Sequence, residues 1–356
     1  MRFTPMLVLF VANLLTVNAD ENRQSTVQQT DHIYENVTRS LWLWDHRMKS
    51  LVVRRSDVDV VLMHKYGNFE LSDLTILDTT FRDAFFSGCH NLVNLAIINS
   101  DLTELEVRFE KLVNFRLINS KITRPVSFNR LKNVKRLTIE SMNFTLNGLS
   151  QLDQLNIHSL ELKNLERTDD VSLSEVNLPL LDTFRVESVS LQGLNMSCWI
   201  FPNLRVLELI DNQLLDVPDN IAEFRQLKLL IIQGNNFSQH QLEPYADFNN
   251  LTSLNLTDNE IRQFLLTEPI SLPELGELII ANNMLEELTC LENLQMPKLN
   301  LIDLQNNRIA SFEILVPMKT RIPHLLLVVS KQEVCESTLS DEEKEMVFGV
   351  QCEVSM

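Results

Sequence analysis

Aliphatic residues recur along most of this chain in one spacing, with polar residues between them. Three segments show the spacing best, Leu204 to Leu214, Leu251 to Ile261 and Leu275 to Leu285, and all three follow the pattern LxxLxLxxNxL. The second and third aliphatic positions are separated by one residue, as in a short strand with one buried face. Each unit is therefore predicted to contain one short strand.

The same eleven-residue template fits at thirteen places, 20 to 24 residues apart. It begins at Met48, Leu71, Leu92, Leu112, Val134, Ile157, Leu181, Leu204, Leu227, Leu251, Leu275, Leu299 and, weakly, Ile322. A unit of this size cannot bury its apolar face alone, so neighbouring units must stack. The repeat therefore predicts a continuous parallel sheet with the connecting segments outside it.

The ninth template position is polar in most units. In the second half of the chain it is asparagine, at Asn212, Asn235, Asn259, Asn283 and Asn307. An amide there can satisfy turn backbone groups that would otherwise be buried without a partner. The early units carry Ser56, Thr79, Ser100 and Ser120, and the middle units carry Met142, Leu165 and Val189. Because these three apolar side chains cannot hydrogen-bond, we expect less regular turns between about residues 134 and 203.

The spacing resembles that of the leucine-rich-repeat family, over residues 48–334. The resemblance implies an α/β solenoid of about 12–13 repeats, with a curved parallel sheet on the concave face and short helical or irregular segments on the convex side. Residues 20–47 are then an N-terminal tail and cap, and residues 335–356 a C-terminal cap. Phenylalanines three residues before several units, at Phe109, Phe201, Phe224 and Phe248, are expected to form a buried stack on the convex side.

The first nineteen residues are typical of a signal peptide. Arg2 is followed by a mostly apolar stretch from Met6 to Val17, and small residues precede a cut after Ala19. The apolar stretch is shorter than the roughly 20 residues that span a bilayer. We therefore expect a secreted, extracellular protein without a membrane span.

Six N-glycosylation sequons agree with export. They begin at Asn36, Asn143, Asn195, Asn236, Asn250 and Asn255.

Five cysteines occur, and their places in the repeat exclude most pairings. Cys335 and Cys352 both follow the last clear unit, and a disulfide between them is expected to close the C-terminal cap. Cys89 is expected to be a buried apolar residue. Cys198 and Cys290 are left without an assigned partner, which leaves open an intermolecular link and hence a homo- or heterodimer.

No motif for catalysis, metal binding or a cofactor was found. The seven histidines form no HxxxH or HExxH pair, and the chain has no GxSxG, no CxxC and no glycine-rich phosphate loop. A net charge of −17 argues against nucleic acid as a partner, because such binding needs many cations. A local basic strip is not excluded. We therefore expect a non-enzymatic protein with no metal and no cofactor.

The concave face offers a candidate binding surface for a protein partner. Template positions three, five, seven and eight face outward there, and in the second half they form a partly apolar column: Val206, Ile210, Leu229, Ile231, Ile279 and Leu301. The alternative is that loops or the C-terminal cap cover this column. Earlier strands carry arginines and acidic residues instead, which suit either polar recognition or solubility.

One sequon conflicts with that surface. Asn255 lies on the strand between those of Ile231 and Ile279, so a glycan on it would stand within the apolar column. The neighbouring Asn250 is the alternative acceptor.

Taken together, these features are similar to the insect leucine-rich immune proteins, of the kind without a C-terminal coiled coil. The resemblance implies a recognition protein in innate humoral immunity that binds protein partners or microbial surfaces. The sequence leaves two alternatives open, an extracellular adhesion or matrix protein and a secreted enzyme inhibitor.

Overall fold

The structure is a computed structural model of all 356 residues. It describes residues 32–43, 47–63, 70–85, 90–103, 105–106, 110–122, 131–140, 146–165, 175–191 and 196–348. These residues belong to one unit, Asp31–Met356.

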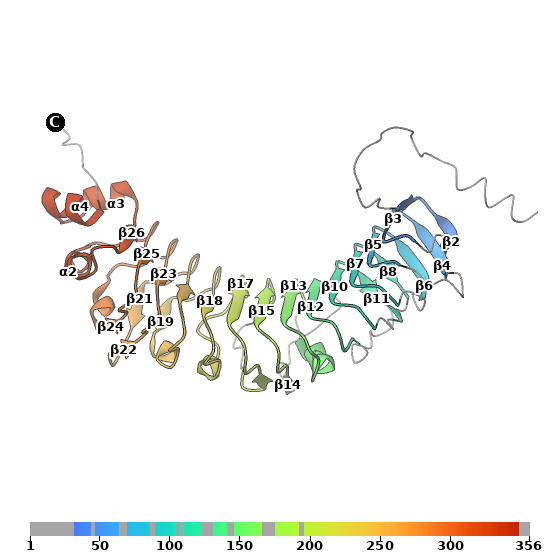
Figure 1. Ribbon diagram of the computed structural model, residues 1–356. Helices are drawn as coiled ribbons and strands as arrows, with labels where there is room; N and C mark the ends of the chain where they lie inside the picture. The colour runs from blue at the N-terminus through green and yellow to red at the C-terminus, as the bar shows by residue number, and fades with distance from the viewer. Residues whose placement is uncertain are drawn as a thin grey trace, which may run out of the picture. The chain divides into compact units, whose positions relative to one another are not determined.

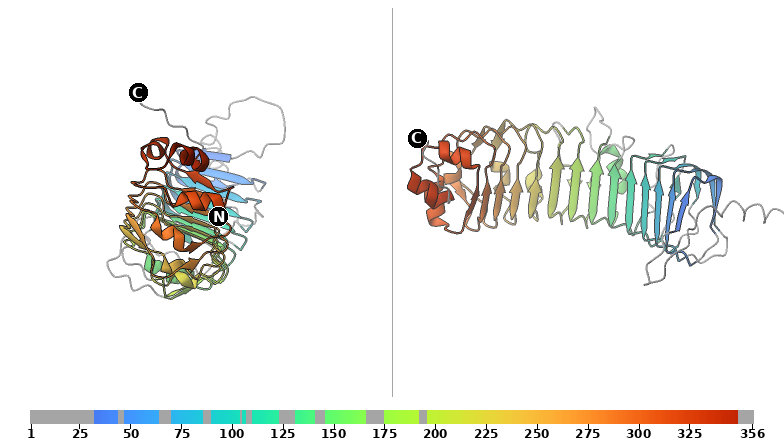
Figure 2. Two further views of the ribbon diagram at one scale, coloured as in Figure 1. Left: turned by 90° about the vertical axis from the view of Figure 1, so that its left-hand side faces the viewer. Right: turned by 90° about the horizontal axis from the view of Figure 1, so that it is seen from above.

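The described residues build one long parallel sheet, here called the inner sheet, on the concave side of this unit (Figure 1). Every strand pairs with the strand of the next repeat, and the right-hand view of Figure 2 shows the strands side by side from above. In order, the strands are β1 (His32–Glu35), β3 (Ser50–Arg54), β5 (Asp73–Leu77), β7 (Asn94–Ile98), β10 (Asn114–Ile118), β12 (Arg136–Glu140), β13 (Ser159–Lys163), β15 (Thr183–Glu187), β17 (Val206–Ile210), β18 (Leu229–Ile231), β20 (Ser253–Asn255), β23 (Glu277–Ile279), β25 (Leu301–Asp303) and β26 (Leu326–Val328).

The pleat of these strands follows the aliphatic pattern. In β3, for example, Leu51 and Val53 are buried while Ser50, Val52 and Arg54 are half-buried. Template positions four and six therefore point into the core, and positions three, five and seven form the open face of the inner sheet. This alternation confirms the predicted sheet.

Most inner strands lead into a residue in the left-handed conformation, at the eighth template position. The residues with positive φ there are Asn36, Arg55, Asp78, Asn99, Asn119, Asn164, Ser188, Asp211, Gly234, Asp258, Asn282 and Asn306. Asparagine, aspartate and glycine adopt this conformation at least cost, which explains the composition of this position. The expectation of less regular middle turns is wrong for the two described there, because Asn164 and Ser188 turn as their neighbours do.

Beyond the turn, the two halves of the unit differ. In the first half the chain enters a second parallel sheet, formed by β2 (Thr38–Leu43), β4 (Asp57–Met63), β6 (Thr80–Phe85), β8 (Asp101–Leu102) and β11 (Lys121–Ile122), with β9 (Leu105–Glu106) beside β6. The expected helical or irregular outer segments are thus absent from these turns as far as they are described. Val58 and Phe81 explain the difference, since each follows the turn as a buried strand residue.

The second half has the outer segments that the resemblance implied. They are the short helices η2 (Leu146–Leu152), η3 (Ile221–Glu223), η4 (Glu243–Tyr245) and η5 (Thr289–Asn293), and the strand pairs β14 (Val176–Asn177) with β16 (Trp199–Ile200), β19 (Gln239–Gln241) with β21 (Gln263–Leu265), and β22 (Ile270–Ser271) with β24 (Leu294–Gln295). Phe201, Phe224 and Phe248 are buried, and the first two rings stack with centroids 6.0 Å apart. Phe109 lies outside the described residues.

Two ends of the array depart from the predicted registers. At the first end, β1 adds a turn before Met48, because His32 pairs with Leu51, so part of the expected cap continues the sheet. At the other end, Leu327 pairs with Ile302. The weak start at Ile322 is therefore wrong by two residues, since it placed Leu325 opposite Ile302. The helix α2 (Leu315–Arg321) occupies the preceding connection and displaces the strand.

Two further helices follow the last strand, α3 (Lys331–Glu336) and α4 (Asp341–Phe348). Ser340 begins α4 with a capping box: its Oγ accepts from the amide of Glu343 at 3.3 Å, and Glu343 Oε2 accepts from the amide of Ser340 at 2.9 Å. The ring of Phe348 packs edge-on against Phe312, with centroids 5.5 Å apart. The helices thus cover core residues beyond the last inner strand.

Candidate binding site

The five predicted asparagines are placed at the turns that follow the inner strands, where they join successive repeats. Asn212, Asn235, Asn259 and Asn283 are buried. Asn235 Oδ1 accepts from the amides of Asn212 and Leu214, at 3.1 and 3.0 Å, and its Nδ2 donates to the carbonyl of Leu209 at 3.0 Å. The other members repeat these contacts, down to Asn307, whose Oδ1 accepts from the amide of Leu285 at 3.0 Å.

Hydroxyl groups do the same in the first half. The amide of Thr79 donates to Ser100 Oγ at 3.1 Å, and the amide of Ser100 donates to Ser120 Oγ at 3.1 Å. In the middle, Leu165 and Val189 are buried apolar residues at the same position. The polar ladder stops there while the inner sheet continues, so packing maintains the repeat across the interruption.

The predicted apolar column on the open face is interrupted. Val206 and Leu229 are neighbours, and Leu301 pairs with the exposed Leu326. Between these two pairs, the same row carries Ser253 and then Glu277.

The remaining members of the predicted column are not contiguous either. Ile231 and Ile279 are separated by Asn255, and Ile210 ends β17. All six predicted residues are half-buried. The second half of the open face therefore presents separate pairs of apolar residues and not one continuous apolar patch.

The sequons differ in exposure. Asn36, Asn236 and Asn250 are exposed and Asn255 is half-buried, whereas Asn143 and Asn195 lie outside the described residues. Asn255 Oδ1 accepts from the amide of Thr257 at 2.9 Å, and Asn250 Nδ2 donates to the carbonyl of Arg225 at 3.0 Å. Whether any of these asparagines carries a glycan stays a prediction.

A contiguous apolar patch lies instead in the first half, where we had expected arginines and acids. Leu77, Ile98 and Ile118 occupy the seventh template position of β5, β7 and β10, and are directly paired. We call these three residues the apolar triad. All three are half-buried on the open face. Their shared position in the repeat was a readable signal that the sequence analysis missed.

Beside the triad stands Arg116, two residues before Ile118 on β10. It is exposed, and the described residues give it no ion pair or hydrogen bond. Its row neighbours are the short side chains Ala96 and Thr138. A guanidinium next to an apolar patch can bind a carboxylate while the patch contacts an apolar side chain.

The other predicted charges of the open face are mostly paired. Arg54 and Arg55 both contact Glu35, at 2.9 and 3.1 Å. Arg185 contacts Glu187 at 2.7 Å and also Glu208. These contacts favour the interpretation that the charges serve solubility and local order rather than recognition.

The pairing changes the acidity of Glu187. Burial alone would raise the pKa of this carboxyl, but hydrogen bonds from Arg185 and Lys163 outweigh burial, and the pKa lies below its ordinary value. Lys163 contacts Glu161 at 2.9 Å and Glu187 at 3.2 Å, which raises the pKa of its ammonium. At the centre of the open face, Lys163 and Arg185 therefore form a network of ion pairs with the neighbouring glutamates.

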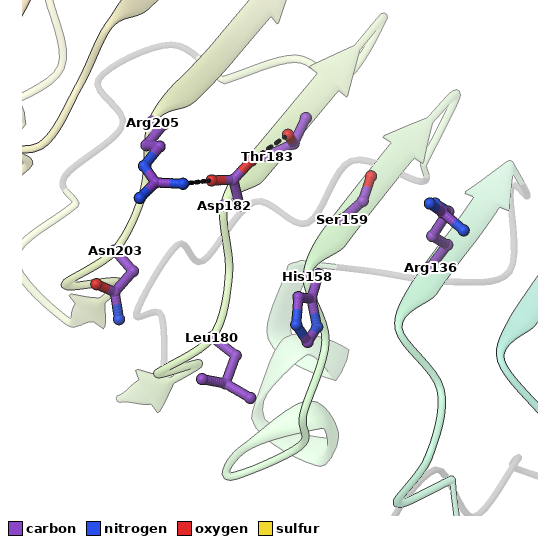
Figure 3. A pocket seen from close by; sticks show the side chains of 8 residues that line it. All are labelled: Arg136, His158, Ser159, Leu180, Asp182, Thr183, Asn203 and Arg205. Atoms are coloured by element: carbon purple, nitrogen blue, oxygen red, sulfur yellow. Dashed lines mark hydrogen bonds and ion pairs between the residues drawn. The ribbon is translucent and has the colours of Figure 1, made fainter.

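A hollow opens at the edge of the sheet where β12, β13, β15 and β17 begin (Figure 3). Its volume is about 580 Å³. The lining residues are Arg136, His158, Ser159, Leu180, Asp182, Thr183, Asn203 and Arg205. Arg205 Nη1 donates to Asp182 Oδ1 at 3.1 Å, the pair drawn in Figure 3. This edge was not among the predicted sites.

Comparison with known proteins gives structural but no sequence relatives. No protein-family model matches the chain, and no curated protein matches it. Among solved structures, a leucine-rich-repeat protein of Leptospira interrogans is 17% identical, with a TM-score of 0.50, and the match covers 86% of this chain and 89% of that one. This chain folds as a leucine-rich-repeat solenoid.

Two further structures of this kind match over large parts of the chain. An internalin of Listeria monocytogenes is 20% identical, with a TM-score of 0.48, and the match covers 76% of this chain and 78% of the internalin. The leucine-rich-repeat ectodomain of a plant membrane receptor kinase from Arabidopsis thaliana, solved in complex with Casparian strip integrity factor 2, is 15% identical. Its TM-score is 0.44, and the match covers 80% of this chain and 38% of the ectodomain chain.

Three of the cysteines lie among the described residues: Cys198, Cys290 in η5 and Cys335 in α3. Cys335, in α3, is disulfide-bonded. Cys89 and Cys352 lie outside the described residues, so the burial of Cys89 and the pairing of Cys335 with Cys352 stay predictions. Cys198 is a half-buried free thiol, and burial, assisted by the charge of Glu175, raises its pKa.

The described part of the solenoid contains no group of three or more histidine, cysteine, aspartate or glutamate side chains that could hold a metal ion. Its helices are all too short or too polar to cross a membrane.

Proposed function

We propose that this chain is a secreted recognition protein, without enzymatic activity, that binds a protein partner through the first half of its open face. The observation that carries the proposal is the apolar triad beside Arg116, which has no ion pair or hydrogen bond within the described part of the chain. Apolar residues on three adjacent strands, next to an exposed cation, fit a partner segment that has a carboxylate beside an apolar side chain.

Several features support export and a role in innate humoral immunity. The apolar stretch before Ala19 is typical of a signal peptide, three exposed sequons lie on the described surface, and Cys335 is disulfide-bonded. The architecture is similar to that of the insect leucine-rich immune proteins. On this hypothesis the protein circulates and binds a protein partner or a microbial surface.

The central experiment compares two charge substitutions on the open face. Ile98→Glu places an acid in the triad, and Ile279→Glu places one in the interrupted column. Ile98 is at template position seven and Ile279 at position five. Other repeats already carry glutamate at these positions, Glu187 at seven and Glu208 at five, so the fold tolerates an acid at either one. Far-UV circular dichroism checks that both variants fold before binding is compared.

The immobilised variants and the unchanged chain are then offered extracellular fluid from the source, and bound proteins are cross-linked and quantified. One stoichiometric partner that is lost with Ile98→Glu and kept with Ile279→Glu supports the proposal. Loss with Ile279→Glu alone assigns binding to the second half. Equal retention by both variants contradicts recognition through the open face.

The immune role is tested separately. Expression that rises after microbial challenge supports it, whereas constant expression in one tissue favours an adhesive or matrix role. Stoichiometric loss of a protease or lipase activity on addition of the chain would instead identify an inhibitor.

A further inference from the structure

The residues that directly precede the inner strands form a continuous row. This row crosses the sheet from strand to strand, at the side where the strands begin. The amide of His158 donates to the carbonyl of Lys135 at 2.8 Å, that of Asp182 to His158 at 2.9 Å, that of Arg205 to Asp182 at 2.9 Å, and that of Lys228 to Arg205 at 2.8 Å. Consecutive side chains are therefore one strand apart, about 4.8 Å. We call these five residues the edge row.

The edge row is cationic although the chain has a net charge of −17. Lys135 and Lys228 are exposed and have no acidic partner among the described residues. Within the part of the chain that the structure describes, Arg136, next to Lys135, donates only to the amide oxygen of Asn114, at 3.2 Å. Asp182 is the single acid, and Arg205 contacts it at 3.1 Å. The uncompensated cations create a local positive potential that favours an acidic ligand.

The hollow of Figure 3 opens onto this row and adds neutral hydrogen-bonding groups. Ser159, Thr183 and Asn203 line it, and Leu180 stands beside them with 42% of its surface exposed. Hydroxyl and amide side chains can donate to or accept from ligand hydroxyls. The exposed leucine offers an apolar contact at the same place.

We propose that the edge row and the hollow bind a linear acidic polysaccharide, in which carboxylate or sulfate groups are separated by hydroxyl groups. The cations at both ends of the row pair with the anionic groups. Asp182, in the middle, accepts hydrogen bonds from hydroxyls, whereas it would repel a carboxylate. Arg136, Ser159 and Thr183 belong to the open face, but the site contains neither the apolar triad nor Arg116, the residues proposed above to contact a protein partner.

The geometry disfavours an acidic peptide. A peptide that adds to a sheet edge uses free main-chain groups, but here the amides of both Asp182 and Thr183 donate to the carbonyl of His158, at 2.9 and 3.0 Å. The row also runs across the strands, so a ligand meets it through side chains alone. From Lys135 to Lys228 it spans about 19 Å, which requires charges repeated along a polymer.

Binding is measured on the full secreted chain with fluorescent oligosaccharides at two salt concentrations. The probes are heparin fragments, which carry sulfate as well as carboxylate, oligogalacturonate, which carries carboxylate alone, and uncharged dextran. The double variant Lys135→Gln/Lys228→Gln removes the ends of the row, and Arg262→Gln/Arg308→Gln is the matched control. The control arginines are exposed and lie beyond the turns, away from the edge row.

The proposal expects binding of one or both acidic probes and none of dextran. It expects about fivefold weaker binding for the edge double variant, with the control unchanged. Binding of oligogalacturonate shows that carboxylates suffice for recognition, whereas binding of heparin alone shows that sulfate is required. Equal affinities of the two double variants, or no binding of either acidic probe, would overturn the proposal.

A second variant separates the saccharide from an acidic protein segment. Asp182→Asn removes the repulsion of a carboxylate, so a ligand recognised by charge alone should bind more tightly to it. A saccharide that donates hydroxyls to Asp182 should gain nothing. Polyglutamate that competes as well as the oligosaccharides, and better after Asp182→Asn, would overturn the assignment to a polysaccharide.

Discussion

Asn212 and Asn235 occupy the same position in consecutive repeats, and the backbone amide of the first donates to Oδ1 of the second at 3.1 Å. The same oxygen accepts from the amide of Leu214, while Nδ2 donates to the carbonyls of Leu209 and Gln233. One buried side chain thus satisfies four backbone groups in two turns. The asparagine ladder is a set of such links.

Replacing Asn235 with alanine should therefore be strongly destabilising. The change leaves two amides and two carbonyls without these partners in a buried turn, at a cost of roughly 3 kcal/mol in the free energy of unfolding. Asn203→Ala is the control, because its exposed side chain makes one hydrogen bond, to the carbonyl of Pro179. Urea unfolding followed by circular dichroism measures both. Similar midpoints for the two variants would contradict the role of the ladder.

The turn residue Gly234 gives a second prediction. Its φ is +68°, and a Cβ there would lie 1.8 Å from Asp211 Oδ1 in the neighbouring turn. Gly234→Ala should cost about 1 kcal/mol or more, because alanine is strained in this conformation and Asp211 must move.

Gly234→Asn should cost less than Gly234→Ala. Elsewhere in the same row, Asn282 Nδ2 donates to Asp258 Oδ1 at 2.7 Å and Asn99 Nδ2 to Asp78 Oδ1 at 3.1 Å. An asparagine at position 234 can make the equivalent bond to Asp211. Thermal unfolding of the two variants checks the order, and the reverse order would mean that crowding rather than conformation decides at this turn.

How far the sequence predicts this structure depends on whether a feature is local. The spacing of Leu51 and Val53 determines which face of a strand is buried, so the inner sheet and its open face were predicted. The left-handed turns are also a local feature, because residues such as Asp211, Gly234 and Asp258 occupy the eighth template position. They were not predicted, because the prediction of the turns rested on the ninth position alone. The second sheet depends on the residues beyond the turn, and the template ends at Val58, the second residue of β4.

The candidate sites were harder to predict because they depend on neighbours in space. Ile231 and Ile279 were expected in one column, but strand pairing places Asn255 between them. The triad takes one residue from each of three consecutive repeats and the edge row one from each of five, so both emerge only when identical positions are compared across repeats. The shift of Leu327 by two residues follows from the inserted helix α2, which no repeat template contains.

Acid should weaken the centre of the sheet. The pKa of Glu187 is lowered in the folded chain despite burial, by hydrogen bonds from Arg185 and Lys163, so its stabilising contribution is complete above the unfolded value near 4.3. This contribution is lost as the pH falls through the lower folded value. Arg185→Gln should lower stability at pH 7 and reduce the difference in stability between pH 7 and pH 3.

The matched control for this prediction is Arg82→Gln. Arg82 contacts Asp59 at 3.2 Å, but the arginine side chain is 67% exposed, so solvent screens the pair. The stability of Arg82→Gln should therefore depend on pH in the same way as that of the unchanged chain. Urea midpoints between pH 3 and pH 7 provide the test, and an unchanged pH dependence in Arg185→Gln would remove the ionic network as its source.

The Cys198 thiol should react slowly in the folded chain. Burial and the nearby charge of Glu175 raise its pKa, which lowers the thiolate fraction at neutral pH. Alkylation by iodoacetamide at pH 7.5, mapped by mass spectrometry, should be slower at Cys198 in the folded chain than in the urea-unfolded chain. For the same reason we expect no intermolecular disulfide through Cys198, and a reducible dimer joined there would contradict the burial of this thiol.

Glycan occupancy at Asn255 decides what the second half of the open face can do. Asn255 is half-buried in the middle of the sheet, whereas Asn236 and Asn250 are exposed, so we expect peptide mapping of the secreted chain to find Asn236 and Asn250 occupied and Asn255 largely bare. A bare Asn255 leaves Ile231 and Ile279 accessible, and Ile279→Glu is then an informative comparison for Ile98→Glu. Full occupancy would place a glycan between these isoleucines and exclude a protein from that half of the face. The apolar triad, seven strands away on β7 and its neighbours, would then be the one apolar patch of the described inner sheet still open to a partner.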